Sequence, residues 1–412
     1  MTHQYFCRFC HTELEHIFVD LGLSPLSNAY LDKQQLAQEE PAYPLKVYVC
    51  SNCFLVQLPE FQTPENIFAD YAYFSSYSDS WLMHAREYTH LMLQRFQYGP
   101  DSLVMEIASN DGYLLQYFSE HKIPVLGIEP AANVARVANQ ANIPTMVRFF
   151  GTSLAAELAA QNRKADLLIG NNVLAHVPDL NDFVQGMKRV LKDDGVATLE
   201  FPHLFKLVEG NQFDTIYHEH FSYFSFHTAV HVFAKHGLTV FDVQELSTHG
   251  GSLRVFVGHN TDRTKKMTRS VAELIAREKQ AGMDSLAFYS AFHHQVQKTK
   301  HRIREFLVQA KEEKKTIAGY GAPAKGNTLL NYCRIGTELL SYTVDKNPVK
   351  QGCYLPGTHI PIFPPEKIQE TKPDYVVILP WNLKDEIMDQ MSCIHNWSGK
   401  FVTFIPEPAI CP

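Results

Sequence analysis

The chain has 412 residues, which is long for a single hydrophobic core and predicts two or three domains. Charged residues of both signs are interspersed, the net charge is −7, and no apolar run approaches the ~20 residues of a bilayer-spanning helix, so the composition favours neither a nucleic-acid nor a membrane partner. The first residues lack the basic end and apolar stretch of a secretory signal, which predicts a cytoplasmic protein in which disulfides are improbable.

Residues 1–75 contain short strand-like pieces, turns and two Cys-x-x-Cys pairs, formed by Cys7 and Cys10 and by Cys50 and Cys53. Each pair places two thiolates at the ends of a tight turn, so the four sulfurs can converge on one zinc ion. Four thiolates leave no coordination position for water or substrate, which indicates a structural metal. The alternatives are buried or redox-active cysteines, or a nucleic-acid-binding zinc ribbon, which the few basic residues of this segment disfavour.

Residues 76–282 alternate between short apolar runs and amphipathic stretches, a pattern typical of a parallel sheet with helices on both faces. The last two runs, 238–243 and 253–257, are joined by a turn too short for a crossover helix and should form an antiparallel pair. We expect a mostly parallel seven-stranded sheet with one reversed strand at its edge. The other predicted strands of this region include 103–107, 125–128, 166–170 and 196–200.

The stretch 103–115 has the pattern of a strand, a tight turn and a helix, and the following strand ends at Glu129. An acidic residue in that position can accept both ribose hydroxyls of an adenosine. The turn lacks the G-x-G-x-x-G that admits a pyrophosphate, but S-adenosylmethionine has no pyrophosphate to admit. An ordinary βα turn is the alternative, although the order of the strands is typical of Rossmann-like methyltransferases.

Other polar residues near this turn complete the predicted donor site. Asp111 or Glu106 could hold the ammonium group of the donor, and Asn171 and Asn172, after the fourth strand, could frame its adenine or carboxylate. The candidate donor-binding residues are Glu106, Asn110, Asp111, Gly112, Glu129, Asn171 and Asn172.

A cluster of histidines, phenols and a carboxylate follows the fifth strand, at the sheet edge where ligands of such folds bind. Tyr217, Glu219 and His220 together supply a general base, a group to orient it and donors that can stabilise a developing oxyanion. His176 follows the fourth strand and should face the same edge. Each histidine could instead be a structural residue with satisfied hydrogen bonds.

Residues 283–412 begin with a predicted connector helix at 283–313, followed by apolar runs at 315–319, 341–344, 375–379 and 401–404 that predict a smaller doubly wound domain. The segment Gly319-x-Gly321-x-x-Ala324-Lys325-Gly326 follows a strand and opens a helix, and Asp345 ends the next strand. Taken alone, this loop could bind a nicotinamide dinucleotide. The alternative function is therefore an NAD-dependent sugar-nucleotide dehydrogenase or epimerase, in which the first Rossmann-like half would lack a role.

Over nearly its whole length the sequence resembles bacterial sugar C-methyltransferases that build 3-C-methyl branched deoxysugars from nucleotide-linked keto-sugars. The matching motifs are Cys7-x-x-Cys10, Cys50-x-x-Cys53, Tyr71-Ala72-Tyr73-Phe74-Ser75-Ser76, Glu106-Ile107-x-Ser109-Asn110-Asp111-Gly112, Asn172-Val173-x-Ala175-His176-Val177, Tyr217-His218-Glu219-His220, His249-Gly250-Gly251-Ser252-x-Arg254 and Gly319-Tyr320-Gly321-Ala322-Pro323-Ala324-Lys325-Gly326-Asn327.

The resemblance implies methyl transfer from S-adenosylmethionine to C3 of an NDP-4-keto-deoxysugar, with a TDP nucleotide, through a base-generated enolate. It implies that His220 is the base, that Tyr217, Glu219 and His176 line the sugar, and that Tyr71 or Tyr73 reaches in from the linker. The C-terminal loop would cradle the diphosphate, so the substrate would bridge both α/β domains. Nothing demands an oligomer. The implied substrate-binding residues are His249, Ser252, Arg254, Gly321, Ala322, Pro323, Ala324, Lys325, Gly326 and Asp345.

Overall fold

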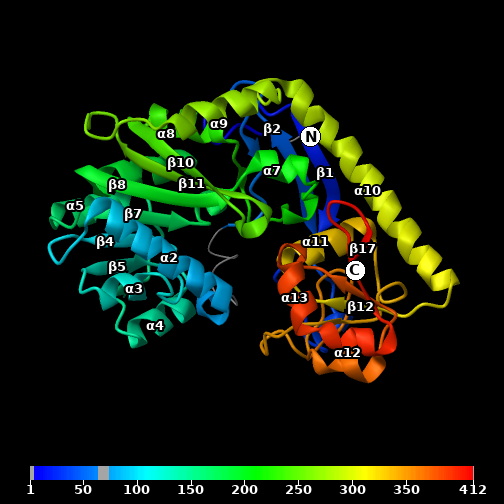
Figure 1. Cartoon of the computed structure of the whole chain (residues 1–412). Helices are drawn as coiled ribbons and strands as arrows, with labels where there is room; N and C mark the ends of the chain where they lie inside the picture. The colour runs from blue at the N-terminus through cyan, green and yellow to red at the C-terminus, as the bar shows by residue number, and fades with distance from the viewer. Residues whose placement is uncertain (1–3, 64–73, 412) are drawn as a thin grey trace.

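The computed structural model describes residues 4–63 and 74–411, whose sheets divide the chain into three regions (Figure 1). We call them the N-terminal module, the central domain and the C-terminal domain, and we propose the divisions 1–75, 76–282 and 283–412 as their limits. None of the described helices combines the length and the apolar character that crossing a bilayer requires.

The sheet of the N-terminal module is antiparallel and takes one strand from far along the chain. Its strands are β1 (His16–Ser24), β2 (Tyr43–Val49), β3 (Val56–Gln57) and β9 (Ser222–Tyr223), in that order. The last strand, β9, directly follows the Tyr-His-Glu-His segment and pairs with β3 through Val56 and Tyr223. The module and the predicted reaction centre are therefore joined by backbone hydrogen bonds.

The sheet of the central domain has the order β10-β11-β8-β7-β4-β5-β6 among the residues that the structure describes. Every strand is parallel except β11, which runs antiparallel to both β8 and β10. This confirms the predicted mostly parallel sheet with one reversed strand, but the reversed strand is not at the edge. The strands are β4 (Val104–Ile107), β5 (Val125–Ile128), β6 (Thr145–Met146), β7 (Ala165–Asn171), β8 (Leu191–Pro202), β10 (Leu238–Leu246) and β11 (Ser252–His259).

The position of β11 follows from the way the hairpin folds back. After the helix that precedes β10, the chain forms β10 at the edge of the sheet, one strand position away from β8. The strand β11 then fills the position between β10 and β8. A strand in that gap has neighbours on both sides, and seven of the eight residues of β11 are buried. Sequence periodicity does not reveal which arm of a hairpin lies outside.

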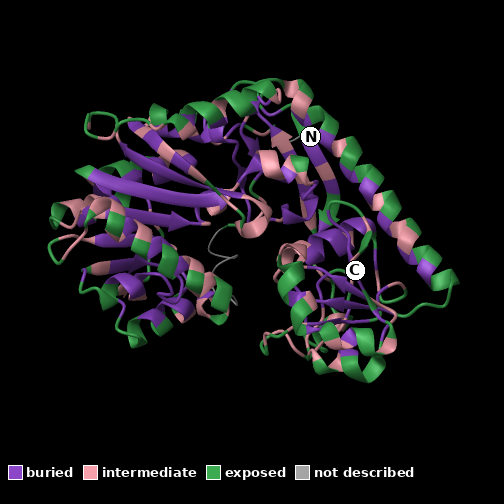
Figure 2. Ribbon diagram, viewed as in Figure 1, coloured by how far each residue is buried: buried purple, intermediate pink, exposed green. Residues whose placement is uncertain are grey.

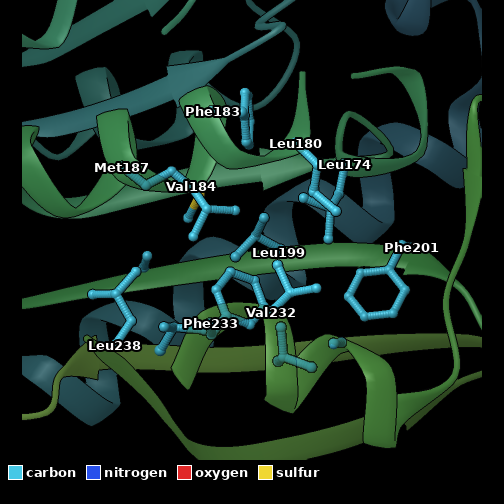
Figure 3. Close-up of a cluster of buried hydrophobic side chains, with 14 of the residues drawn as sticks. Leu174, Leu180, Phe183, Val184, Met187, Leu199, Phe201, Val232, Phe233 and Leu238 are labelled. Carbon is cyan, nitrogen blue, oxygen red and sulfur yellow. The ribbon is translucent and has the colours of Figure 1, made fainter. Parts of the chain in front are cut away.

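Helices cover both faces of this sheet, whose strands are largely buried (Figure 2). Asp179 is the N-cap of the helix α6 (Leu180–Val190), and its side chain accepts a hydrogen bond from the backbone N–H of Asp182. Its buried residues lie on one face and join side chains of α8 (Phe226–Lys235) and β8 in one apolar cluster (Figure 3). The other helices of this domain are α2 (Asp79–Phe96), α3 (Leu115–Glu120), α4 (Ala132–Gln140), α5 (Thr152–Ala160), α7 (Leu204–Glu209) and α9 (Arg269–Gln280).

The predicted connector is a single helix, α10 (Leu286–Glu312), which runs from the central domain along the N-terminal module to the C-terminal domain (Figure 1). It packs on β1, where the ring of Phe292 stacks on Phe18 with centroids 4.6 Å apart. The helix therefore holds the N-terminal module against the other two regions.

The C-terminal domain is a smaller doubly wound sheet, as predicted. In the described chain its strand order is β14-β13-β12-β15-β16-β17, and all neighbours are parallel except β17. The strands are β12 (Ile317–Tyr320), β13 (Thr343–Val344), β14 (Ile362–Phe363), β15 (Tyr375–Ile378), β16 (Lys400–Thr403) and β17 (Ala409–Cys411), and the helices are α11 (Ala324–Cys333), α12 (Glu366–Thr371) and α13 (Lys384–Gln390).

The N-terminal module also binds the C-terminal domain directly. Leu31 and Tyr354 exchange backbone hydrogen bonds of 3.0 and 2.8 Å, and the carboxylate of Glu40 accepts from the backbone N–H of Gly357 at 2.9 Å. On the other side, the Thr228 hydroxyl of the central domain donates to the carbonyl of Cys53 at 3.1 Å. The module thus contacts both α/β domains and lies between them.

Candidate active site

The four N-terminal cysteines converge as the sequence predicts. Their sulfurs all lie within 4.8 Å of one another, and those of the pairs Cys7–Cys53, Cys10–Cys50 and Cys10–Cys53 are 3.4–3.5 Å apart. Zinc–sulfur bonds of ~2.3 Å in a tetrahedron place sulfurs ~3.8 Å apart, so the cluster fits a zinc ion closely. Side-chain and backbone N–H groups of Gln57 and Asn52 point at two of the sulfurs. This is a structural zinc site.

The predicted donor turn lies at the carboxyl end of β4 and is shaped by three residues with positive φ. These are Ala108, Asn110 and Gly112, and a Cβ at Gly112 would lie 3.1 Å from the side chain of Ile143. A glycine is needed there for both its conformation and its lack of a side chain. Glu129, at the end of β5, accepts backbone N–H groups of Asn110 and Ala131 at 3.0 and 2.8 Å. The carboxylate therefore fixes the shape of the turn.

Three carboxyl groups, those of Glu106, Asp111 and Glu129, gather at this turn, and all three are buried. Burial raises the pKa of Glu106 well above its ordinary value, and the neighbouring Asp111 and Glu129 add to the effect. Burial also raises the pKa of Glu129. A site with this concentration of buried carboxyls favours a cationic ligand, and S-adenosylmethionine carries both a sulfonium and an ammonium group.

Asn171 and Asn172 line the same cavity at the end of β7. Asn171 is 8% exposed, and neither its amide oxygen nor its amide nitrogen has a hydrogen-bond partner within the described residues. Buried amides in folded proteins are normally paired, so this side chain is suited to a ligand. The observation supports the proposed placement of the donor.

The short 3-10 turn Ser75–Tyr77, which precedes α2, covers the donor turn. The backbone N–H of Ser75 donates to the side chain of Asn110 at 2.9 Å, and that of Ser76 donates to Asp111 at 3.2 Å. Trp81, one turn into the helix, lines the cavity, and its ring lies 5.4 Å from that of His249. The predicted contributors Tyr71 and Tyr73 precede this segment and lie outside the described residues.

A single cavity of about 740 Å³ joins the donor turn to the other two regions. Its volume is in the range of ~300–1,000 Å³ typical of small-molecule sites. It is lined by Asn110, Glu129, Asn171 and Asn172 on the donor side, by His176, Tyr217, Glu219, His220 and His249 in the middle, by Asn28 and Tyr30 of the N-terminal module, and by Pro323, Ala324, Lys325 and Lys350 of the C-terminal domain.

His220 is 8% exposed and has one of its ring nitrogens fixed by the backbone. Its Nδ1 lies 2.9 Å from the carbonyl oxygen of Thr215, which can only accept a hydrogen bond, so Nδ1 carries the proton and Nε2 carries the lone pair. Burial lowers the pKa of His220 well below its ordinary value, and His176 and Lys325 contribute to the effect. His220 is therefore a neutral imidazole at neutral pH and can accept a proton at Nε2.

Aromatic and imidazole rings surround His220. The ring of Tyr217 is centred 4.1 Å away and that of His176 is centred 4.8 Å away. Burial lowers the pKa of His176 to about 4, and burial together with Lys325 lowers the pKa of His249 to about 4. The structure thus brings together His176, Tyr217 and His220 from two separate segments of the chain.

The loop between β12 and α11 approaches the cavity from the opposite side. Gly321 has a φ of +89°, and a Cβ there would lie 2.5 Å from Pro380, so only glycine fits. Lys325 donates to the side chain of Asn382 at 2.6 Å and lies over the ring of Trp381. Lys350 joins it in the cavity lining. Two cations and the N-terminus of α11 make this wall favourable for an anion.

Several predicted substrate residues do not reach the cavity lining. Asp345 accepts the backbone N–H of Ala322 at 2.7 Å and therefore shapes the loop from behind. Ser252 is 2% exposed and donates to the carbonyl of Thr248. The guanidinium of Arg254 is buried against Glu200, whose carboxylate also contacts His84. Gly321, Ala322 and Gly326 also lie outside the lining, whereas Pro323, Ala324, Lys325 and His249 are part of it.

The cavity residues that the sequence did not indicate include Asn28, Tyr30, Trp81 and Lys350. Two of them belong to the segment Ser27-Asn28-Ala29-Tyr30, whose polar residues follow Pro25 in a module interpreted as purely structural. The polar character of that segment is the available signal, but nothing in it indicates a position next to residue 219. Lys350 lies five residues beyond Asp345, at a position where the Rossmann pattern predicts no ligand-binding residue.

Three family models match the chain in succession: a zinc binding domain over residues 7–68, a methyltransferase domain over residues 82–243 and a C-methyltransferase C-terminal domain over residues 247–406. The C-methyltransferase NovU of Streptomyces niveus is 35% identical over 404 residues, which cover 98% of this chain and 96% of that protein.

Solved structures with a partial likeness include the PH0226 protein from Pyrococcus horikoshii OT3, with 15% identity and a TM-score of 0.37 over 48% of this chain and 99% of that one. An S-adenosylmethionine-dependent methyltransferase from Clostridium acetobutylicum ATCC 824 has 11% identity and a TM-score of 0.36 over 43% of this chain and 92% of that one. By its match to NovU along nearly the full length of both proteins, the chain belongs to the family of S-adenosylmethionine-dependent C-methyltransferases with an N-terminal zinc-binding domain.

Proposed function

We propose that the enzyme methylates C3 of an NDP-4-keto-deoxysugar, the carbon next to the ketone, in the synthesis of a branched deoxysugar. The observation that carries this proposal is the tautomer of His220, whose Nδ1 is fixed on Thr215 and whose Nε2 is left for a substrate in the shared cavity. A carbon acceptor needs such a base, since its C–H proton must be removed before the carbon can act as a nucleophile.

The bound donor supplies an electrophilic methyl group on its sulfonium. His220 takes the proton from the carbon beside the ketone, and the C–H electron pair becomes the enolate of the acceptor. Tyr217 and His176, whose rings lie within 5 Å of that of His220, would donate to the enolate oxygen. With the donor bound, the enolate carbon would take its methyl group, and the sulfur would keep the electron pair of the broken sulfur–methyl bond. Glu129, Asn171 and Asn172 would hold the donor.

The nucleotide end of the substrate is assigned to the C-terminal wall of the cavity. Lys325 and Lys350 would bind the diphosphate together with the N-terminus of α11, because charged donors in a partly buried wall attract phosphate oxygens. A TDP nucleotide is the form that the family resemblance favours. The alternative of an NAD-dependent dehydrogenase or epimerase leaves the donor pocket of the central domain without a role.

The test is solvent exchange at the acceptor carbon. Enzyme, S-adenosylhomocysteine and TDP-linked 4-keto-deoxysugars are incubated in deuterated water, and exchange beside the ketone is followed by NMR. The wild type should exchange that proton, and His220→Asn should slow exchange by roughly 10²–10⁴-fold. His301→Asn, on the exposed face of α10, is the matched control.

Two results would contradict the proposal in different ways. Full exchange and turnover in His220→Asn would show that His220 is not the base, and Glu219 or Tyr217 would then be the candidates for that role. A wild-type enzyme that neither exchanges nor methylates any keto-sugar nucleotide would remove the proposed substrate class.

A further inference from the structure

The side chain of Glu219 is bound by a residue of the N-terminal module. Glu219 is 6% exposed, and its Oε1 accepts a hydrogen bond of 2.5 Å from the amide nitrogen of Asn28. The two residues are 191 positions apart in sequence. Asn28 belongs to the segment that follows β1, and it lines the cavity that holds the proposed reaction centre.

A second residue of the same segment, Tyr30, contacts the C-terminal domain. Its hydroxyl donates to the carbonyl of Ala322 at 2.6 Å, and it lies 3.3 Å from the amide oxygen of Asn28. Lys350 donates to that same carbonyl at 2.9 Å. Because an ionised carboxylate can only accept, the contact with Glu219 itself orients the Asn28 amide with its N–H groups toward that carboxylate. The segment therefore links the reaction centre to the nucleotide-facing loop.

We propose that Asn28 is a positioning residue of the reaction centre, which favours the ionised form of Glu219 in the cavity that His220 also lines, so that the zinc-binding module influences the charge state of this site. The catalytic consequence rests on the proposed function, whereas the effect on Glu219 does not. A carboxylate that shares the cavity with His220 would stabilise the imidazolium that forms when His220 takes a proton.

The electrostatics agree with the geometry. Burial raises the pKa of Glu219 to about 7, and the hydrogen bond from Asn28 acts against that rise. A hydrogen-bond donor favours the ionised carboxylate, so its removal must raise the pKa further. Because the pKa lies near neutrality with this hydrogen bond in place, removing the bond shifts the carboxyl group toward its neutral form at pH 7.

The other titratable groups of the cavity leave this role to Asn28. The histidines in the middle of the cavity are neutral near pH 7 because burial lowers the pKa of each, and the side chain of His218 lies 3.3 Å from the carbonyl of Pro44 in the module. The lysines of the opposite wall contact Asn382 and Ala322. Besides Glu219, the titratable groups that line this cavity include Tyr30 from the module, Glu129, Arg148, His176, Asp179, Asp182, Tyr217, His218, His220 and His249 from the central domain, and Lys325 and Lys350 from the C-terminal domain.

The experiment measures the charge of Glu219 directly. The full-length, zinc-loaded enzyme is labelled with ¹³C at the glutamate carboxyls, titrated by NMR, and the Glu219 signal is identified by its loss in Glu219→Gln. In Asn28→Ala the midpoint should rise by about 1 pH unit or more, since a hydrogen bond to a charged group exceeds the tenfold change in equilibrium that one pH unit represents.

The same rise should appear in the pH dependence of solvent exchange at the acceptor carbon. Exchange by the wild type should fall as the pH drops through the midpoint of Glu219, and in Asn28→Ala this fall should begin about 1 pH unit higher. Asn28→Asp keeps the shape of the side chain and replaces the amide donor with a second carboxyl, so it should raise the midpoint at least as far. This second variant decides the matter if Asn28→Ala fails to fold.

The matched control is Glu40→Ala, which removes another contact between the module and the C-terminal domain but lies outside the cavity lining. It should leave the Glu219 midpoint unchanged. An unchanged midpoint in folded, zinc-loaded Asn28→Ala or Asn28→Asp would overturn the proposal. A raised midpoint in an enzyme that shows no exchange in its wild-type form would uphold the role of Asn28 and remove the proposed sugar chemistry.

Discussion

The donor and acceptor halves of the cavity are assembled in different ways. The donor half comes almost entirely from one stretch of chain, the β4 turn and the end of β5, with Asn171 and Asn172 added from the adjacent strand β7. The acceptor half combines the segment after β1, the loops after β7 and β8, the β10–β11 turn and the C-terminal loop. A local site depends on one turn, whereas a dispersed site depends on how whole domains dock.

This difference has a consequence for the zinc ion. The zinc ion cannot bind water or substrate, because its four thiolate ligands leave no open coordination position. Yet the module that it holds together supplies Asn28 and Tyr30 to the acceptor half and pairs with β9 beside the reaction centre. Loss of the zinc ion should therefore weaken acceptor binding more than donor binding.

The largest effect is expected from removing a zinc ligand. Cys50→Ser should abolish zinc binding and, because structural zinc contributes ~10 kcal/mol or more to the folding of such modules, unfold the N-terminal module. Acceptor binding should fall by more than about 100-fold, as expected when several contacts of ~1–3 kcal/mol are lost together, while donor affinity should change far less. Elemental analysis and calorimetry with each ligand check this. Cys393→Ser, outside the cluster, is the control. Unchanged acceptor binding without zinc would contradict the dependence of the acceptor half on the N-terminal module.

A smaller effect, confined to the acceptor half, is expected for Lys325. Lys325→Ala should raise the KM for the sugar nucleotide by about 10–100-fold, since it removes a charged donor worth ~1.5–3 kcal/mol. Donor affinity should stay the same. Lys346→Ala, an exposed residue outside the cavity lining, is the control. If Lys325→Ala instead abolished donor binding, the donor and acceptor sites would have to be assigned to the opposite halves of the cavity.

The reciprocal change in the donor half is Glu129→Ala. It should weaken S-adenosylmethionine binding by ~1.5–3 kcal/mol through the loss of a charged hydrogen-bond acceptor. Calorimetry should show acceptor affinity unchanged, and Glu120→Ala on the exposed end of α3 provides the control. Tight binding of NAD by the wild type at this site would favour the dehydrogenase that the C-terminal glycine loop allows.

The smallest effect is expected for Ser252, which lies behind the acceptor half. The family resemblance predicts a contact with substrate, but its hydroxyl donates to the Thr248 carbonyl and it does not line the cavity. Ser252→Ala should therefore cost ~1 kcal/mol in the free energy of unfolding and leave the KM of both substrates unchanged. A raised KM for the sugar nucleotide with native stability would restore Ser252 to the substrate site.

Much of the fold follows from local patterns in the sequence. The cysteine spacing predicts the zinc cluster, the alternation of apolar runs predicts both α/β domains, and the spacing of apolar residues in 283–313 predicts α10. The prediction placed the reversed strand at the sheet edge, whereas β10 occupies that edge. Pairing partners are decided by the gap that the rest of the sheet leaves, and a hairpin has the same periodicity in either orientation.

Local sequence was enough to predict the chemistry of the donor turn, because Glu106, Asp111 and Glu129 lie within a single βαβ unit whose geometry is local. It also placed His176 and His220 at one sheet edge, and the structure shows their rings 4.8 Å apart. The contact of Asn28 with Glu219, and the position of Lys325 and Lys350 in one cavity, become visible only in the folded chain. Those contacts depend on the docking of three regions through surfaces such as Phe18 on Phe292, and no local pattern encodes that docking.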